Sequence, residues 1–145
     1  MAKSIFVNLP VTDLDRSVRF YEAIGCTRDA RFSNEKAAAM KWSDTVSFML
    51  LTHEFYATFT PKQIIDAKTT SGALIALSFD SRADVDAVSE AAIAARGREL
   101  HGPEDEGFMY SRAFEDPDGH GFGPFWMDVD AALAGMADAR EPAAA

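Results

Sequence analysis

Apolar residues alternate with other side chains along the segment Ile5–Val11, and this pattern predicts a β-strand. Alternate side chains of a strand point to opposite faces, so Phe6, Asn8 and Pro10 share the face opposite the more uniformly apolar one. Pro10 has no N–H to give to a neighbouring strand, which favours a sheet edge or a bulge at this end.

Two later segments carry apolar residues at helical spacing. The first follows a cap at Thr12 or Asp13 and stops at Gly25. The second starts at the capping box Ser81-Arg-Ala-Asp84 and stops at Gly97. Each helix follows a predicted strand.

Further strands are predicted at residues 37–42, 45–52, 73–79, 108–114 and 120–127. The polar tract from His53 to Gly72 is predicted to link two halves, with a short helix over Lys62–Ala67. The acidic segment Glu99–Gly107 is predicted to be a loop. The Ala-rich tail from Asp130 is expected to carry a frayed helical turn and to end in disorder.

The order strand, helix, strands therefore occurs twice. Phe6 and Leu74 lie in corresponding strands 68 residues apart, and Gly25 and Gly97 end corresponding helices. This is an internal repeat, and it predicts a fold built from two similar modules. Each half buries one face of a small sheet, so joining the halves leaves a concave surface between them.

Charge and composition narrow the function. The formal charge is −9, and the 14 Lys and Arg residues form no basic block, which argues against nucleic acid and acidic membrane surfaces as partners. No apolar run reaches the ~20 residues that span a bilayer. The N-terminus has no apolar signal region, so we expect a cytoplasmic protein. The single Cys26 cannot form an internal disulfide.

The last strands enclose the turn Asp116-Pro117-Asp118-Gly119, which has the composition of a type I turn. Together with His120, this turn resembles the closing hairpin of the vicinal oxygen chelate superfamily. The segment Asn8–Tyr21, followed by Gly25, resembles the opening helix of the same superfamily, which includes glyoxalase I (lactoylglutathione lyase), extradiol dioxygenases, and bleomycin and fosfomycin resistance proteins.

The resemblance covers about residues 4–128 and implies an α+β fold, in which two tandem βαβββ modules form an open, cup-shaped mixed sheet. It implies one domain over residues 1–128, followed by the tail 129–145. Module one spans about 4–55, the linker about 53–72 and module two about 73–128. A homodimer is also implied.

Enzymes of the superfamily hold a divalent metal (Zn, Ni, Fe or Mn) with His, Gln or Glu on the first strand of each module and Glu on the last strand. Counted from the motifs, these positions fall on Phe6, Leu74 and Gly123. None of the three side chains has a donor atom for a cation. We therefore expect no metal cofactor, and whether the protein is an enzyme stays open.

Residues near the predicted cup are candidates for binding a ligand: Asn8, Trp42, Phe48, Tyr110, Arg112, Gly123, Phe125 and Trp126. Arg112 could hold a carboxylate or phosphate group, or could pair with an acid such as Glu115 or one in the acidic loop. His120 is the candidate for catalysis, and hydrogen bonding across the turn is its alternative role. A rebuilt metal site would need His53, His101 and His120 to converge.

These observations leave three hypotheses for the function of the protein. The leading hypothesis is a protein that binds a small organic molecule in the cup without the usual metal. The competing hypothesis is a metal-dependent enzyme of the glyoxalase I or extradiol dioxygenase type, whose metal would act as a Lewis acid. The third is a structural dimer with a filled cup.

Overall fold

The computed structural model describes residues 2–140, which form two four-stranded sheets with helices. The elements in chain order are β1 (Ile5–Val11), α1 (Leu14–Ala23), β2 (Thr27–Asp29), a 3-10 turn (Ala30–Phe32), β3 (Ala37–Lys41), β4 (Val46–Thr52), α2 (His53–Tyr56), β5 (Leu74–Ser78), α3 (Arg82–Ala94), β6 (Arg98–Asp105), β7 (Met109–Glu115), β8 (Gly121–Met127) and α4 (Val129–Arg140).

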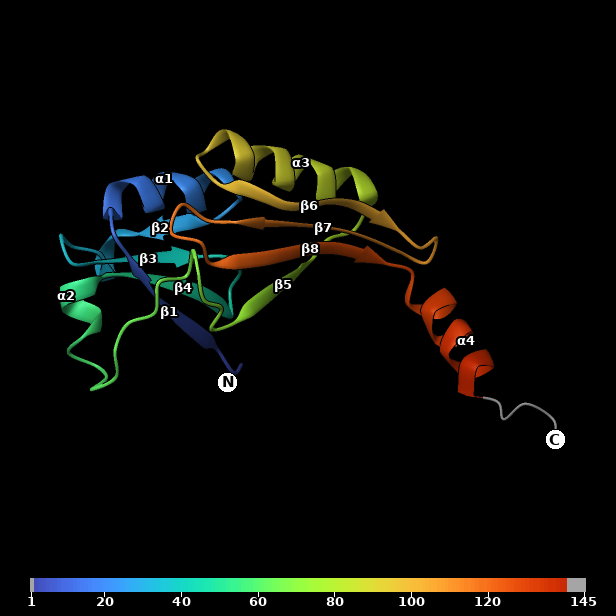
Figure 1. Ribbon diagram of the computed structural model, residues 1–145, viewed down its shortest axis with the longest axis horizontal. Coiled ribbons are helices and arrows are strands. Elements are labelled where there is room, and N and C mark those ends of the chain that lie inside the picture. The colour runs from blue at the N-terminus through green and yellow to red at the C-terminus, as the bar shows by residue number, and fades with distance from the viewer. Residues whose placement is uncertain (1, 141–145) are drawn as a thin grey trace.

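The two sheets repeat one topology. The strand order is β1-β4-β3-β2 in the first sheet and β5-β8-β7-β6 in the second. In each sheet the first and last strands of the module pair in parallel, and the other pairs are antiparallel. Helices α1 and α3 cover the same side of the two sheets (Figure 1). The predicted α+β fold of two βαβββ modules is confirmed.

Several local predictions need correction. Residues 62–67 form no helix, and the short helix after module one is α2 instead. The predicted loop over Glu99–Gly107 is largely strand β6. The tail forms a 12-residue helix, α4, rather than a single frayed turn. The predicted disorder at its end falls on residues 141–145, outside the described part of the chain. Within residues 2–140, no helix is both long and apolar enough to cross a membrane.

The helix caps follow the sequence pattern. Asp13 caps α1 by accepting a hydrogen bond from the Arg16 backbone N–H at 3.1 Å, which settles the choice between Thr12 and Asp13. Ser81 caps α3 through the Asp84 N–H at 3.1 Å. At the end of α3 the left-handed residue is Arg96, with φ 76°, rather than the following glycine.

Both modules share one hydrophobic core. Phe20 and Tyr21 of α1 pack across the module boundary against Phe114 and Phe122, with ring centroids 6.1 and 5.9 Å apart. Phe48 of β4 also meets Phe122, at 5.7 Å. Helix α1 is therefore packed against both sheets, and the modules are not independent units.

Gly97 lies where the modules press together. A Cβ atom at this position would be 2.7 Å from the Ala92 carbonyl oxygen, from the Glu115 carbonyl oxygen and from Cε2 of Phe20. Two of these three neighbours are backbone atoms that cannot rotate away. Glycine is thus required by packing at this site.

We expect Gly97→Ala to lower the free energy of unfolding by about 1–3 kcal/mol, because an added methyl group in a filled site forces backbone shifts. The matched control is Gly135→Ala in α4, where a Cβ would meet nothing within 4 Å. Urea unfolding of both variants makes the comparison. Equal stability of Gly97→Ala and the wild type would contradict the close packing.

Candidate functional site

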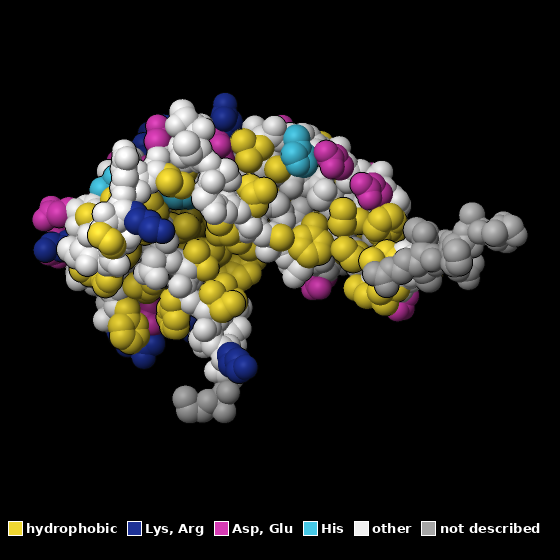
Figure 2. Space-filling view, turned by 60° about the horizontal axis from the view of Figure 1, so that its bottom comes forward, with side chains coloured by type: hydrophobic (Ala, Val, Ile, Leu, Met, Phe, Trp, Pro, Cys, Tyr) yellow, Lys and Arg dark blue, Asp and Glu magenta, His cyan; other side chains and the backbone are white. Residues whose placement is uncertain are grey.

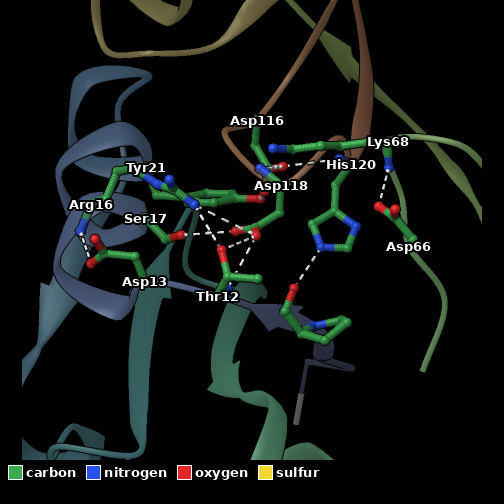
Figure 3. A network of polar contacts seen from close by, with 11 residues as sticks. Thr12, Asp13, Arg16, Ser17, Tyr21, Asp66, Lys68, Asp116, Asp118 and His120 are labelled. Atoms are coloured by element: carbon green, nitrogen blue, oxygen red, sulfur yellow. Dashed lines mark hydrogen bonds and ion pairs between the residues drawn. The ribbon is translucent and has the colours of Figure 1, made fainter. Parts of the chain in front are cut away.

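The turn between β7 and β8 is fastened to the start of helix α1. The Thr12 backbone N–H and hydroxyl both donate to Asp118 Oδ1, at 3.1 and 2.6 Å (Figure 3). The Ser17 hydroxyl donates to Asp118 Oδ2 at 3.4 Å, and Arg16 Nη2 lies 3.6 Å from Oδ1. Asp118 is buried. Its carboxylate faces the positive end of the helix dipole, where negative charge is favourable.

Asp116 forms the second half of this attachment. Its Oδ1 accepts the backbone N–H groups of Asp118 and His120, each at 2.9 Å, and its Oδ2 accepts the Tyr21 hydroxyl at 2.8 Å. Burial raises the pKa of Asp116, against the opposing effect of the nearby His120. Burial also raises the pKa of Tyr21 well above its usual value. We call the contacts of Asp116 and Asp118 with Thr12, Ser17 and Tyr21 the turn clasp.

His120 bridges the modules through its side chain. Its Nε2 lies 2.8 Å from the Pro10 carbonyl oxygen. A carbonyl oxygen only accepts, so Nε2 carries the hydrogen. His120 as a whole is 9% exposed, and its other ring nitrogen faces the linker segment with Asp66 and Lys68 (Figure 3). His120 thus holds the end of β1 against the hairpin, a role broader than the predicted bond across the turn.

The linker lies directly on the same turn. Gly119 has φ 98°, and a Cβ at this position would be 2.6 Å from the backbone of Ala67 and Lys68. A side chain is excluded both by the left-handed backbone and by this contact. The linker is thereby held as a wall beside the two modules.

A cavity of about 740 Å³, here the inter-module cavity, opens between the linker and the two sheets. It is lined by Val7, Leu9 and Pro10 of β1, Tyr56, linker residues 60, 62–65 and 67–73, Leu74 and Ile75 of β5, Leu100, Glu115, and Gly119, His120 and Gly121. Hydrophobic side chains gather on the hollowed face opposite α1 and α3 (Figure 2). The volume suits a small organic molecule.

A sequence profile of the Glyoxalase/Bleomycin resistance protein/Dioxygenase superfamily matches residues 4–123. The chain belongs to this superfamily. No protein of curated function matches the sequence. The match spans both modules and the turn clasp.

Solved structures share the fold. A glyoxalase/bleomycin resistance protein/dioxygenase family enzyme from Burkholderia phytofirmans PsJN has a TM-score of 0.71 at 19% identity, over 87% of this chain and 99% of that one. The fosfomycin resistance protein FosX from Mesorhizobium loti has a TM-score of 0.66 at 17% identity, over 91% and 97%. A bleomycin resistance determinant encoded on transposon Tn5 has a TM-score of 0.60 at 19% identity, over 88% and 99%.

The three positions that the resemblance predicts for metal ligands carry no donor side chains. Phe6 and Leu74 are 62% and 78% exposed. Leu74 pairs with Gly121, and its Cδ2 is 2.9 Å from where a Cβ of Gly121 would lie. Gly123, one further step along the same face, has no side chain either. These residues do not fit a divalent metal.

The three histidines of the alternative metal site do not converge. His53 and His120 line a second cavity of about 340 Å³ behind the linker. His101 lies on β6, where its Nδ1 is 2.9 Å from the Gly102 carbonyl oxygen. Among residues 2–140, no three His, Cys, Asp or Glu side chains are grouped as a metal site would require.

The eight predicted ligand-binding residues lie in several places. Asn8 lines a cavity of about 250 Å³ with Leu51, Tyr56, Phe59 and Thr60. Gly123 and Phe125 alternate with the α3-facing residues of β8, and lie on the open face of the second sheet. None of the eight lines the inter-module cavity.

The other five predicted residues pack under the helices or at the module boundary. Phe48 is core, at 1% exposed, and Trp42 packs on Phe79 with centroids 5.9 Å apart. Trp126 lies under Arg82, whose guanidinium carbon is 4.4 Å from the ring centroid. Tyr110 donates to Asp86 of α3 at 2.6 Å.

Arg112 forms ion pairs with acidic side chains of the protein itself. Its guanidinium pairs with Asp86, Glu90 and Glu99 at 2.9–3.2 Å, and its side chain is 7% exposed. Of the two predicted partners, an acid of the segment Glu99–Gly107 is confirmed by Glu99, and Glu115 is not a partner of Arg112. Glu115 pairs with Arg98 at 2.9 Å instead.

Sequence reasoning missed the linker as a cavity wall. Lys62, Lys68 and Ser71 stood in a tract without periodicity, so nothing marked them as facing a cavity. The one available signal was the placement of two lysines in the connection between repeats of an acidic chain.

We expect Asp118→Ala to lower the free energy of unfolding by about 2–4 kcal/mol, because it leaves the buried Ser17 hydroxyl without its acceptor and removes both bonds from Thr12. Asp130→Ala, an exposed position on α4, should change stability by no more than about 0.5 kcal/mol. Urea unfolding compares the two. A similar small effect of both substitutions would refute the turn clasp.

The buried carboxyl of Asp116 predicts a pH effect. Because its pKa is raised in the folded protein, the folded state holds this proton at pH values where the unfolded state, with a pKa of about 3.9, has lost it. The contribution of Asp116 to stability therefore falls as pH rises above that value.

As the pH rises from about 4 to about 7, we expect the free energy of unfolding of Asp116→Asn to increase relative to that of the wild type. Urea unfolding at both pH values measures it. A shift in the opposite direction would show that the pKa of Asp116 is lowered.

Proposed function

We propose that the protein binds a small organic molecule in the inter-module cavity, without the divalent metal used by enzymes of its superfamily. The observation that carries this proposal is the cavity itself, about 740 Å³ bounded by both modules and the linker. Val7, Leu9, Leu74 and Ile75 give it an apolar floor. Pockets of this size and character bind small molecules in proteins generally.

The lack of metal-binding side chains at the predicted ligand positions supports binding without a metal. Benzyl and isobutyl side chains stand at positions 6 and 74, and both Gly121 and Gly123 lack side chains. A metal-dependent enzyme would need donors from elsewhere, and the three histidines are spread over separate segments. The cavity also weighs against the third hypothesis, in which the space between modules is filled by side chains.

Resistance proteins that match the fold suggest a role for such binding. FosX is a fosfomycin resistance protein, and the Tn5 protein is a bleomycin resistance determinant. A role in sequestering an organic molecule would use a cavity and needs no catalytic residue. His120 does not need to act as a base in this proposal, because its Nε2 hydrogen is held by Pro10.

A homodimer and a cytoplasmic location stay predictions. Ile5 and Phe6 at the start of β1 are 61% and 62% exposed, and a second copy would cover such apolar surface. Light scattering on the purified protein determines the mass in solution.

The test combines elemental analysis with ligand screening. Protein purified without chelators should carry no stoichiometric Zn, Ni, Fe or Mn, and ligand-observed NMR should find small aromatic compounds that bind. Ala73→Trp places an indole at the cavity wall and should weaken that binding by about tenfold or more. Ala134→Trp on the exposed side of α4 is the matched control.

About one tightly bound metal ion per chain, with an activity that depends on it, would overturn the proposal. Equal binding by Ala73→Trp and the control would move the binding site away from this cavity.

A further inference from the structure

We propose that the inter-module cavity selects organic anions, molecules with an apolar body and one acidic head group, through Lys62 and Lys68. This inference rests on the proposed function, because it names the class of ligand that the same cavity takes. It concerns residues of the linker, which differ from the strand positions that carry metal ligands in other members of the superfamily.

The cavity has one apolar side. Val7 and Leu9 of β1 face it from module one, and Leu74, Ile75 and Leu100 face it from module two. Leu74 and Leu100 are 78% and 44% exposed, so burying them against a ligand removes apolar surface from water. This side fits the hydrocarbon or aromatic body of a ligand.

The charged and titratable groups of module two around the cavity are already engaged. Glu115 is bound to Arg98 at 2.9 Å, so its negative charge has a partner. His120 holds the Pro10 carbonyl oxygen through Nε2. A cationic ligand would therefore find no free carboxylate among the described residues that line the cavity.

The two lysines lie on the opposite wall. Lys62 and Lys68 both line the cavity, and within residues 2–140 neither ammonium group forms an ion pair. The backbone of Lys68 is fixed by its N–H bond to Asp66 Oδ1 at 3.1 Å and by the contact with Gly119. The linker thus places two exposed lysines beside the cavity, and the side chain of Lys68 runs along the turn that carries Asp116 and His120 (Figure 3).

The positive charge of the two lysines is opposite in sign to the net charge of the protein. The chain carries a formal charge of −9, yet the only carboxylate among the residues that line this cavity is the paired Glu115. Opposite charges attract across a partly desolvated cavity more strongly than in open solvent. The side chains of Gln63 and Ser71, also on the wall, add neutral hydrogen-bond donors for the oxygens of an acid.

The experiment compares two probes of the same shape, 1-naphthoate and 1-naphthamide, by titration calorimetry on the full chain. The carboxylate should bind roughly tenfold more tightly than the amide, and sodium chloride should weaken only the carboxylate. The variant Lys62→Gln/Lys68→Gln should lose roughly five- to tenfold in affinity for naphthoate and leave naphthamide unchanged.

The matched control is Lys3→Gln/Lys36→Gln, which removes the same two charges at exposed positions away from the cavity. This control should leave the affinities for naphthoate and naphthamide unchanged. It therefore separates the effect of the cavity lysines from the effect of the net charge of the protein. Circular dichroism and urea unfolding of both double variants check that each is folded.

The outcomes separate the two proposals. Equal binding of both probes, unaffected by the lysine substitutions, would overturn the selection of anions and leave the cavity as a binding site. An equal loss for both probes in Lys62→Gln/Lys68→Gln would also overturn it, because the lysines would then shape the wall rather than attract charge. If neither probe binds, the result counts against the proposed function itself.

Discussion

Two buried carboxylates of one turn connect the halves of this protein. Asp118 holds Thr12 and Ser17 at the start of α1, and Asp116 holds the Tyr21 hydroxyl one turn further along the same helix. Such charges are costly to bury without partners, and here each carboxylate oxygen accepts at least one hydrogen bond. The aromatic contacts of Phe20 and Tyr21 with module two complete the same interface.

The position of the cavity depends on this attachment. With the turn fixed against α1, His120 reaches the Pro10 carbonyl and the linker crosses Gly119, so β1, the hairpin and the linker surround one space. The Asp-Pro-Asp-Gly-His segment that marks the superfamily therefore serves architecture here. The motif can therefore be present in a chain whose predicted metal-ligand positions have no donor side chains, since the motif joins the modules and binds no metal itself.

Much of the fold could be predicted because its signals are local. The repeat, the Ser81 cap and the alternation that puts Asn8 on the open face of β1 follow from spacing alone. Strand β6 was missed because Gly102, Pro103 and several acids give it the composition of a loop, which an edge strand with an irregular register tolerates.

The site was harder to predict because it depends on contacts between distant segments. Nothing in the sequence around Arg112 shows that α3 supplies two of its acidic partners. Likewise, the linker lysines reach the cavity only because residues 67 and 68 rest on a turn about fifty positions away. Faces of strands can be read from alternation, whereas the assembly of a cavity from two modules and a linker cannot.

The contacts of the turn clasp and the shared core join the two modules into one cooperative unit. The chain has two tryptophans, Trp42 in module one and Trp126 in module two. Trp42→Phe and Trp126→Phe each leave a single fluorescent reporter in one module, and the direct measurement is urea unfolding of both variants, each with and without Asp118→Ala. If the modules unfold together, fluorescence and far-ultraviolet circular dichroism give coincident transitions within each variant, and Asp118→Ala destabilises both variants equally. Separate transitions, or a loss seen only by Trp126, would contradict it.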